Sequence, residues 1–329
     1  MPVKEAAEIE IIRLMKAGRG AYTSGQSLSS SLGISRTAVW KHIKTLKKMG
    51  FQIEASPSKG YRLTGELPFN GVEVASSLST KFVGKNIFFY PRIDSTNIKA
   101  FELGRSGEGE GTAVIAEAQD KGKGRVGRVW ESPAGLNLYT SIILRPPVAP
   151  QFAHNLTFVL AVAAAEAVGL FVKQRPTVKW PNDVLVNGRK LAGILLEMDS
   201  EPDRVHFVVA GIGVNINIRR EMFPPYIKNT ATSIAEERGE EAGRAEFARS
   251  LYSSIELWYK IYLDKGFLPI LEAWKGYFDA EGKEVRVSSF NRAITGVCCG
   301  VDADGALLVK LSSGKVERVV SGDVETGKT

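Results

Sequence analysis

The first fifty residues place apolar side chains at the spacing of amphipathic helices, separated by short polar turns. Ser24 offers an N-cap for a short second helix, and Gly33 ends that helix as a left-handed C′ residue. Ser35 caps a third helix that runs to about Met49. The apolar positions of the first two helices are Ile9, Ile12, Met15, Leu28 and Leu32. Two helices joined by so tight a turn predict a helix-turn-helix.

The third helix has two distinct faces. Its apolar stripe consists of Val39, Ile43 and Leu46. The opposite face, with its flank, carries Arg36, Thr37, Lys41, Lys44 and Lys48. From residue 35 to residue 49 the chain has five Lys or Arg and no acid. Alternating apolar residues at 51–53 and 61–63, with turn residues at 57–60, predict a hairpin that forms a wing.

Beyond a linker at 65–68, strand-like and helical segments are mixed. Several predicted strands are consecutive, which favours a mixed α+β sheet over a regular βαβ alternation. The strands are expected at 87–90, 112–118, 138–144, 191–198 and 205–216, and the helices at 151–170, 247–263 and 267–278. From residue 281, short strands at 284–288, 293–301, 306–311 and 316–320 predict a small β-barrel. The predicted domains are therefore 1–65, 66–280 and 281–329.

The positive charge is confined to the first of these domains. The chain holds 43 Lys and Arg against 36 Asp and Glu, a net charge of +7. Residues 1–64 contain seven Lys and four Arg against four Glu and no Asp, which is also +7, so the remainder is neutral. This asymmetry is typical of an appended nucleic-acid-binding domain. A basic face that is merely solvated is the alternative that composition alone leaves open.

Several other protein classes are not expected. The two cysteines, Cys298 and Cys299, are adjacent, which excludes a disulfide framework and a zinc site built from cysteine pairs. The longest apolar run, 158–165, is shorter than the ~20 residues that cross a bilayer. The N-terminus has no apolar stretch before a small-residue cleavage site. We therefore expect a cytoplasmic protein that has no metal cluster and no membrane partner.

A glycine-rich segment at 122–127 reads Gly-Lys-Gly-Arg-Val-Gly. It follows a predicted strand, but the next residues contain Pro133 and Gly135 and do not open a helix, so it is not a dinucleotide-binding turn. Its cations are Lys121, Lys123, Arg125 and Arg128. Glycines let backbone amides approach an anion while these side chains supply charge, which favours a polyphosphate ligand. A flexible basic surface loop is the alternative.

Three further segments have both a structural and a functional interpretation. Residues 179–183 (Lys-Trp-Pro-Asn-Asp) end a strand, and an Asn187-Gly188 hairpin turn and Lys190 follow. This arrangement fits a polar ligand site and simple turn chemistry equally well. Residues 94–97 (Asp-Ser-Thr-Asn) precede a helix and are expected to cap it. The glycines of 211–215 (Gly-Ile-Gly-Val-Asn) are expected to allow close packing.

Taken together, six segments in one order resemble the biotin–protein ligases. They are Asp-Ser-Thr-Asn (94–97), Glu-Ala-Gln (117–119), Gly-Lys-Gly-Arg-Val-Gly-Arg-Val-Trp (122–130), Lys-Trp-Pro-Asn-Asp (179–183), Arg-Lys-Leu-Ala-Gly-Ile (189–194) and Gly-Ile-Gly-Val-Asn-Ile-Asn (211–217). With its helix-turn-helix, the whole chain resembles the bifunctional biotin ligase/biotin-operon repressor family. The resemblance implies a winged helix, a central α+β domain related to class II synthetases, and an SH3-like C-terminal barrel.

The resemblance also implies an activity. Biotin and ATP would form biotinyl-5′-AMP, and a lysine of a biotin carboxyl carrier domain would then accept the biotin. Magnesium is expected with the ATP phosphates, without assigned protein ligands. The partners would be the carrier domain, operator DNA and, on ligand binding, a second copy of the chain. The alternatives are a biotin-responsive transcription factor without catalysis and a lipoate-type ligase.

Individual residues receive roles from the same resemblance. Those implied to hold biotin are Ser95, Thr96, Asn97, Gln119, Lys123, Gly124, Arg125 and Lys190. Arg125 and Lys190 would also be catalytic. Those implied to contact the nucleotide are Arg128, Trp130, Asn182, Asp183 and Asn215. The expected DNA contacts are Ser35, Arg36, Thr37, Lys41, Lys44 and Lys48.

Two departures from the family pattern change the expectations. The family loop usually has Arg where this chain has Lys123. Lysine keeps the charge but loses the bidentate fork, so we expect looser retention of the adenylate. The segment 219–232, which covers the adenine in repressor members, has no Trp here, so Phe223, Tyr226 or neighbouring apolar residues would take its place.

Overall fold

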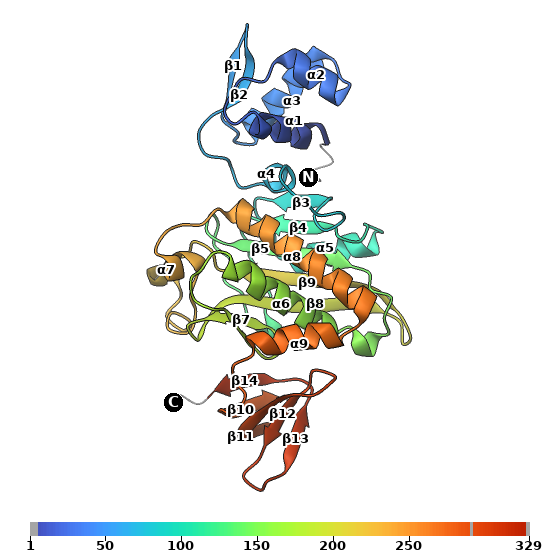
Figure 1. Ribbon diagram of the computed structural model, residues 1–329, viewed down its shortest axis with the longest axis vertical. Coiled ribbons are helices and arrows are strands. Elements are labelled where there is room, and N and C mark those ends of the chain that lie inside the picture. Colours follow the sequence, from blue (N-terminus) through green and yellow to red (C-terminus); the bar gives the residue numbers. More distant parts are fainter. Residues whose placement is uncertain (1–5, 290–291, 327–329) are drawn as a thin grey trace.

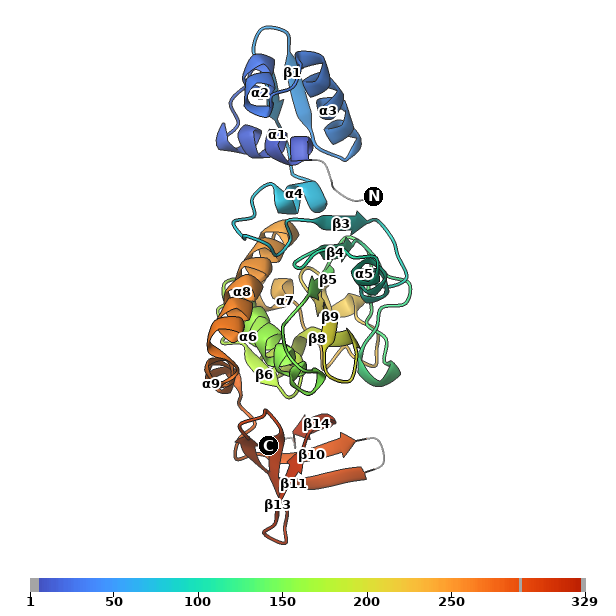
Figure 2. The same cartoon turned by 90° about the vertical axis from the view of Figure 1, so that its right-hand side faces the viewer.

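The computed structural model describes residues 6–289 and 292–326, so the outermost ends of the first and third predicted domains lie outside the described residues. Three bodies follow one another along the long axis, with the N-terminal helices at one end and a β-sheet at the other (Figures 1 and 2). The largest body lies between them and contains a seven-stranded sheet. The predicted order of helix-turn-helix, mixed α+β domain and β domain is confirmed.

The N-terminal module (residues 6–63) forms as its caps and apolar spacing predict. The Ser24 hydroxyl accepts from Ser27 N at 3.0 Å, Gly33 adopts φ 65°, and the Ser35 hydroxyl accepts from Ala38 N at 3.1 Å. Val39 and Leu46 are fully buried, and an antiparallel hairpin completes the wing. Its elements are α1 (Ala6–Ala17), α2 (Gly25–Leu32), α3 (Arg36–Lys48), β1 (Ile53–Ser56) and β2 (Gly60–Leu63).

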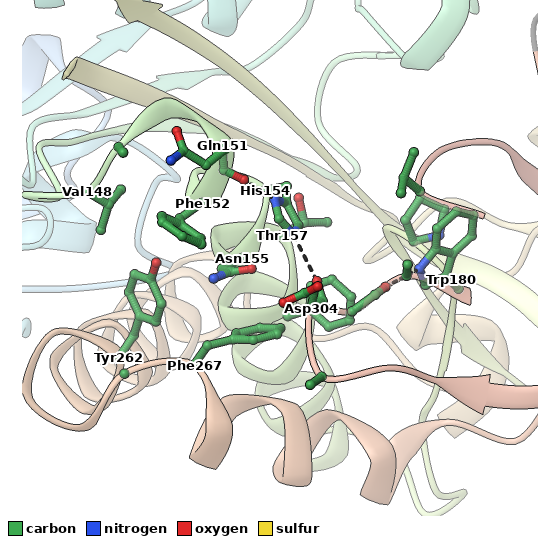
Figure 3. Close-up of a pocket in the computed structure, with 18 of the residues that line it drawn as sticks. Val148, Gln151, Phe152, His154, Asn155, Thr157, Trp180, Tyr262, Phe267 and Asp304 are labelled. Atoms are coloured by element: carbon green, nitrogen blue, oxygen red, sulfur yellow. Dashed lines mark hydrogen bonds between the residues drawn. The ribbon is translucent and has the colours of Figure 1, made fainter. Parts of the chain in front are cut away.

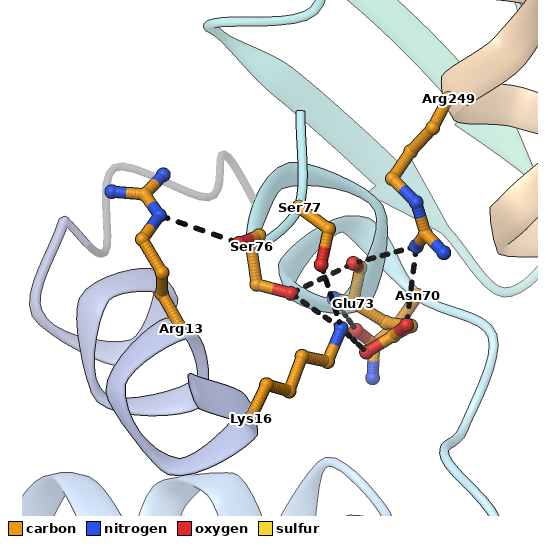
Figure 4. Close-up of polar contacts among 7 residues, drawn as sticks. All are labelled: Arg13, Lys16, Asn70, Glu73, Ser76, Ser77 and Arg249. Carbon is orange, nitrogen blue, oxygen red and sulfur yellow. Dashed lines mark hydrogen bonds and ion pairs between the residues drawn. The ribbon is translucent and has the colours of Figure 1, made fainter. Parts of the chain in front are cut away.

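A helix that the sequence analysis did not predict, α4 (Gly71–Ala75), joins this module to the central domain. Val72 belongs to the core of the N-terminal module, whereas Val74 belongs to the core of the central domain. Between them, the buried carboxylate of Glu73 lies 2.6 Å from Lys16 Nζ of α1 and 3.2 Å from Arg249 Nη1 of the central domain (Figure 4). Burial lowers the pKa of Lys16, which the Glu73 carboxylate partly offsets. The two bodies therefore share apolar packing and a buried ion cluster.

The central sheet has the strand order β3-β4-β5-β9-β8-β7-β6. The β3–β4 pair is parallel and the other pairs are antiparallel, so the predicted mixed sheet is confirmed. Its strands are β3 (Ile87–Tyr90), β4 (Ala113–Ala116), β5 (Leu138–Leu144), β6 (Thr177–Lys179), β7 (Asp183–Val186), β8 (Arg189–Ser200) and β9 (Val205–Val214). The positive φ angles of Asn187 and Gly188 confirm the predicted hairpin turn between β7 and β8.

Helices cover both faces of this sheet (Figure 2). The helix α5 (Thr96–Arg105) packs on β4, β5 and β9 through a cluster that includes Ala100 and Phe207. On the other face lie α6 (Asn155–Gly169), α8 (Arg244–Lys265) and α9 (Leu268–Tyr277), while α7 (Ile234–Arg238) lies near β7. Within the described residues, the one segment apolar and long enough to cross a membrane is Pro150–Gly169, and 72% of its apolar window is buried. This segment is the core helix of the central domain.

The C-terminal body is an antiparallel sheet of order β13-β12-β11-β10-β14. Its strands are β10 (Glu284–Ser289), β11 (Arg292–Val301), β12 (Leu307–Lys310), β13 (Val316–Val319) and β14 (Asp323–Thr326). The sequence analysis expected the first four and not β14, in which only Val324 is buried. Among the described residues, no ladder joins β13 to β14, so the pairing is that of an open sheet.

Candidate active site and DNA-binding face

Two glycines of β9 form the floor of the candidate active site. Alternate residues of a strand point to the same face, and on the α5 face Phe207 and Val209 pack beneath that helix. The next two positions on this face are Gly211 and Gly213. A Cβ at Gly211 would overlap the side-chain oxygen of Asn97, and a Cβ at Gly213 would overlap the indole of Trp130. The two glycines, here called the glycine floor, therefore admit these side chains against the strand.

A buried polar network stands beside the glycine floor. Gln119 Oε1 accepts from the backbone N–H of Thr96 at 2.8 Å, and Gln119 Nε2 donates to Ser132 Oγ at 2.9 Å. The hydroxyl of Ser141 lies 2.8 Å from Thr96 Oγ1 and 2.6 Å from Asn97 Oδ1. These amide and hydroxyl groups offer both donors and acceptors. They suit a neutral ligand that presents both kinds of group on one edge.

The network extends to a carboxylate on β8. Glu197 Oε2 accepts from Asn97 Nδ2 at 2.8 Å, and Glu197 Oε1 lies 2.9 Å from Lys123 Nζ. Ser95 is the N-cap residue of α5 and is 2% exposed, but its hydroxyl makes no capping hydrogen bond. The predicted capping role of this segment therefore holds for the backbone position, while the Ser95 hydroxyl is not used in the cap.

The cationic loop (residues 121–128) is folded back on itself. Gly124 N donates to Arg128 O at 2.7 Å, and Trp130 N donates to Gly122 O at 2.9 Å. A Cβ at Gly122 would overlap the carbonyl of Trp130, so this position requires glycine. No α-helix follows the loop, as predicted, and only a 3₁₀ turn, Arg125–Gly127, interrupts it.

Besides Lys123, which reaches Glu197 on β8, the cations of the loop contact three further parts of the chain. Lys121 Nζ pairs with Asp94 at 2.8 Å, and this contact raises the pKa of Lys121. Arg125 Nη1 donates to Asn182 Oδ1 at 3.1 Å and lies 3.9 Å from Asp323 of the C-terminal sheet. Arg128 forms an ion pair with the same Asp323. Because these partners come from the segment before α5, the β6–β7 turn and β14, the loop bridges distant parts of the central domain and contacts the C-terminal body.

One wall of the site combines Trp130 with residues of the β7–β8 hairpin. Lys190 Nζ lies 5.3 Å from the centroid of the Trp130 ring and 2.8 Å from Asp183 Oδ1. Asn182 Nδ2 donates to Ile194 O at 2.7 Å, which leaves its oxygen for Arg125. Trp130 Nε1 is buried without a hydrogen-bond partner among the described residues. An unpaired buried donor is unfavourable, so this N–H is a candidate ligand contact.

Asn215 and Ser35 occupy positions that are already used structurally. Asn215 is 6% exposed, and its amide nitrogen donates to Thr232 O at 3.0 Å. It therefore fixes the segment after residue 230. The Ser35 hydroxyl caps α3. The cap by Ser35 was predicted from the sequence and is confirmed, whereas nothing in the sequence indicated the contact of Asn215 with Thr232.

The segment 219–232 gives different surroundings to its two aromatic residues. Phe223 is 4% exposed and packs in a small core that includes Leu136 and Ile227. Tyr226 is 69% exposed, and its hydroxyl donates to Glu131, which raises the pKa of Tyr226. The sequence analysis expected Phe223 or Tyr226 to take the place of a tryptophan that covers the adenine. Of these two residues, Tyr226 is the exposed one.

Sequence reasoning missed four residues of the site: Ser132, Ser141, Glu197 and Asp323. Ser132 lies just after the segment 122–130, the other three come from strands distant in sequence, and none of the four stands in a recognisable motif. The one available signal was Ser141, which with Thr140 interrupts the apolar residues of strand β5. Its register partner is Gly211, which places it on the glycine floor.

A cavity lies elsewhere and is a separate feature. It has a volume of about 1070 Å³ and lies between the start of α6, the end of α8 and the C-terminal sheet (Figure 3). His154 lies 2.9 Å from Asp304 O, and Trp180 Nε1 donates to Gly305 O at 2.9 Å, so this region attaches the C-terminal sheet to the central domain. None of the predicted site residues lines it.

The described residues contain no cluster of three or more His, Cys, Asp or Glu side chains that could hold a metal ion. Of the carboxylates near the site, Asp183 and Glu197 are each paired with a lysine, and Asp323 is paired with Arg128. These residues therefore provide no cage of oxygen ligands made by the protein alone. A magnesium ion at this position would be held chiefly by substrate phosphates and water.

The predicted DNA-binding face of α3 is open to solvent. Thr37 is exposed, and so are all the cations of α3, namely Arg36, Lys41, Lys44, Lys47 and Lys48. The opposite face is buried against α1, where His42 Nδ1 also lies 2.6 Å from the buried Glu8. The cationic face is therefore available for a polyanion.

Comparison with known protein families assigns all three bodies. Residues 89–215 match the Biotin/lipoate A/B protein ligase family, residues 8–62 an HTH domain, and residues 282–327 the Biotin protein ligase C terminal domain. The chain is 38% identical over 321 residues to the Bifunctional ligase/repressor BirA of Bacillus spizizenii, covering 97% of this chain and 98% of that protein. It is 32% identical to the protein of the same name from Escherichia coli, covering 96% of each.

A solved structure agrees with these relationships. The biotin protein ligase from Aquifex aeolicus in complex with biotin and ATP is 28% identical and superposes with a TM-score of 0.65. That structure covers 76% of this chain, and all of its own chain is matched.

Proposed function

Because this chain belongs to the bifunctional biotin ligase/repressor family, we propose that it joins biotin to a lysine of a carrier domain and represses transcription through its N-terminal module. The observation that carries the ligase assignment is the cationic loop, folded over a polar network on the glycine floor.

The chemistry divides into an adenylyl-transfer step and an acyl-transfer step. A carboxylate oxygen of biotin attacks the α-phosphorus of ATP, the bond from that phosphorus to the bridging oxygen breaks, and pyrophosphate leaves. The ε-amine of the carrier lysine then attacks the acyl carbon of biotinyl-5′-AMP, and AMP leaves. A carboxylic acid of pKa ~4–5 is already ionised at pH 7, so the first step needs no general base. It needs alignment and stabilisation of the charge that moves through the phosphate.

The polar network supplies the biotin contacts in this proposal. Thr96, Gln119 and Asn97 would pair with the donors and acceptors of the ureido ring, together with Ser95. The apolar surface of the indole of Trp130 would adjoin the ring system. A ligand that lacks the matching groups would be disfavoured, because buried polar groups that pair with biotin would then be left without a partner.

The cations would act on the carboxylate and the phosphates. Lys190 would lie beside the carboxyl–phosphate junction, and Arg125 would release Asn182 to contact the α-phosphate. Lys123, Gly124 and Arg128 would complete the cover over the adenylate and exclude water. Asn182 and Asp183 would face the nucleotide. Magnesium would arrive with the ATP phosphates, and we assign it no protein ligand.

The repressor function would use the exposed face of α3. Arg36, Thr37, Lys41, Lys44 and Lys48 would contact an operator, and Ser35 would fix the start of the helix. Helix-turn-helix proteins usually bind two-fold sites as dimers. We therefore propose a homodimer that forms when biotinyl-5′-AMP is bound.

One experiment separates the ligase from its alternatives. The full chain is incubated with ATP, labelled biotin and a biotin carboxyl carrier domain, and in parallel with lipoate. Labelled carrier lysine and biotin-dependent pyrophosphate exchange are expected. Exchange with lipoate alone would indicate a lipoate-type ligase, and binding of biotin without any transfer would indicate a non-catalytic regulator.

A further inference from the structure

Trp40 is an exposed tryptophan on a helix whose other large apolar residues are buried. It is 53% exposed, whereas Trp180 and Trp274 are buried and Trp130 and Trp258 are half-buried. All five tryptophans of the chain lie within the described residues. A large ring in water contributes nothing to the core of the N-terminal module. The ring is therefore free to contact a ligand.

The charges around Trp40 favour a polyanion as that ligand. Trp40 lies one helical turn from both Arg36 and Lys44, and Lys44 Nζ is 5.4 Å from the ring centroid. The helix carries no acidic residue. A cation held against the ring keeps that side of the indole polar and leaves its other surfaces free. A second apolar protein surface would have to desolvate these cations, whereas a phosphate backbone neutralises them.

Trp40 also borders a groove between α3 and the wing. This groove has a volume of about 690 Å³, and Arg36 and Thr37 line the same side of it. The opposite side is formed by the hairpin turn around Lys59 and by Tyr61. The ring thus lies where the helix would approach a duplex, between cations on the helix and a cation at the wing.

We propose that Trp40 reads thymine in the major groove of the operator, by packing its indole edge on the C5-methyl group. In the major groove this methyl is the one apolar group that a base pair presents, and an apolar side chain recognises it. The neighbouring cations contact phosphates, which position the helix without reading sequence. The inference rests on the proposed DNA-binding function and assigns a sequence-reading residue to it.

The test compares thymine with uracil, which lacks only the methyl group. A duplex pool with a random core is enriched on the full-length protein in the presence of biotin and ATP. The best duplex is then synthesised with thymine and with uracil throughout the core. We expect wild-type affinity to fall about fourfold for each methyl lost from a contact. Trp40→Ala should bind both duplexes equally, and Trp40→Phe should keep most of the discrimination.

A matched control separates sequence reading from charge. Lys48→Gln should weaken binding to the thymine and uracil duplexes by the same factor, because it removes a phosphate contact. Thermal unfolding of Trp40→Ala should match the wild type, since half of the ring is already in water. Discrimination that persists in Trp40→Ala would overturn the inference while leaving DNA binding intact.

A second readout uses the exposure of Trp40. The difference in acrylamide quenching between wild type and Trp40→Phe reports this side chain alone. It should fall when the enriched duplex is bound. Protection that appears on addition of biotin and ATP without DNA would assign Trp40 to contact with a second copy and would overturn the inference. If the wild type binds no duplex at all, both the proposed repressor function and the inference about Trp40 fail.

Discussion

The indole of Trp130 lies directly against the backbone of Gly213, in space that any Cβ at Gly213 would occupy. The same ring faces Lys190 of β8, the strand next to that of Gly213, and Lys190 Nζ lies 5.3 Å from the ring centroid. A glycine in the middle of an apolar strand thus sets the position of an aromatic wall and, through it, of a cation. The glycine floor is for this reason part of the candidate site, although neither glycine has a side chain.

Gly213→Ala should impair adenylation. The new methyl group would displace Trp130, and overpacking of this kind costs about 1–3 kcal/mol, so we expect kcat/KM for biotin to fall about 5- to 150-fold. Biotin-dependent pyrophosphate exchange measures this rate. The control is Gly276→Ala, in the exposed part of α9, where a Cβ meets open space and exchange should be unchanged. Normal pyrophosphate exchange in Gly213→Ala would show that adenylation does not depend on the packing of Trp130 against Gly213.

Glu73→Gln should destabilise the junction between the N-terminal module and the central domain. Lys16 and Arg249 share the buried carboxylate and would keep their charges without it. We expect a loss of about 1–3 kcal/mol in the free energy of unfolding measured with urea. Glu10→Gln removes an exposed ion pair on the same helix α1 and should change stability by less than about 0.5 kcal/mol. Equal effects of the two substitutions would argue against the buried cluster.

The stability of the central domain should depend on the ionisation of Glu256. Burial raises the pKa of this carboxyl. Hydrogen bonds from the backbone N–H groups of Phe82, Lys81 and Val83 together lower it by more, so the net pKa lies below the ordinary value for glutamate. A carboxyl whose pKa is lowered by folding stabilises the native state above its unfolded pKa, and this stabilisation is lost as the pH falls through the lowered value.

Glu256→Gln should therefore be less stable than the wild type at pH 7, by about 2 kcal/mol. The difference should shrink as the pH falls below the ordinary pKa of a glutamate, because the carboxyl of the unfolded chain takes up a proton there before that of the folded protein. Urea unfolding at pH 7 and pH 3.5 measures both differences. A difference that stays constant with pH would contradict the assigned role of the carboxylate.

DNA affinity should fall as a power of salt concentration, because cations on α3 displace counterions from the phosphates. Replacing Lys48 by Gln should reduce the slope of log affinity against log salt by about 0.9. Lys85→Gln makes the same charge change on an exposed residue of the central domain and should leave the slope unaltered. Fluorescence anisotropy with the enriched duplex at several salt concentrations gives the slopes. Affinity that does not vary with salt would contradict phosphate contact by this face.

Local chemistry made much of the fold predictable. The caps by Ser24 and Ser35, the left-handed Gly33 and the turn at Asn187 each act within a few residues, so the sequence alone locates them. The helix α4 escaped prediction because five residues are too few to display a helical period. The strand β14 also escaped prediction, because Val324 is its one buried residue and a single buried position shows no alternation.

The site was predictable only where a residue stands in a motif. Glu197 closes the network between Asn97 and Lys123, yet its position depends on the register of β8 against β9, where it pairs with Val209. Asp323 meets the cationic loop from a different body of the protein. Such contacts follow from tertiary placement, which no local pattern encodes. The family resemblance supplied the roles of the motif residues, but not these partners.

The central claim is that the cationic loop retains the activated adenylate, and the release rate of labelled biotinyl-5′-AMP from the full chain tests it most directly. Arg125→Ala removes a charge-assisted contact, so release should be about tenfold to a hundredfold faster than from the wild type. Arg92→Ala, a nearby arginine that is mostly exposed, should release the adenylate at the wild-type rate. Equal release rates from wild type and Arg125→Ala would contradict the account.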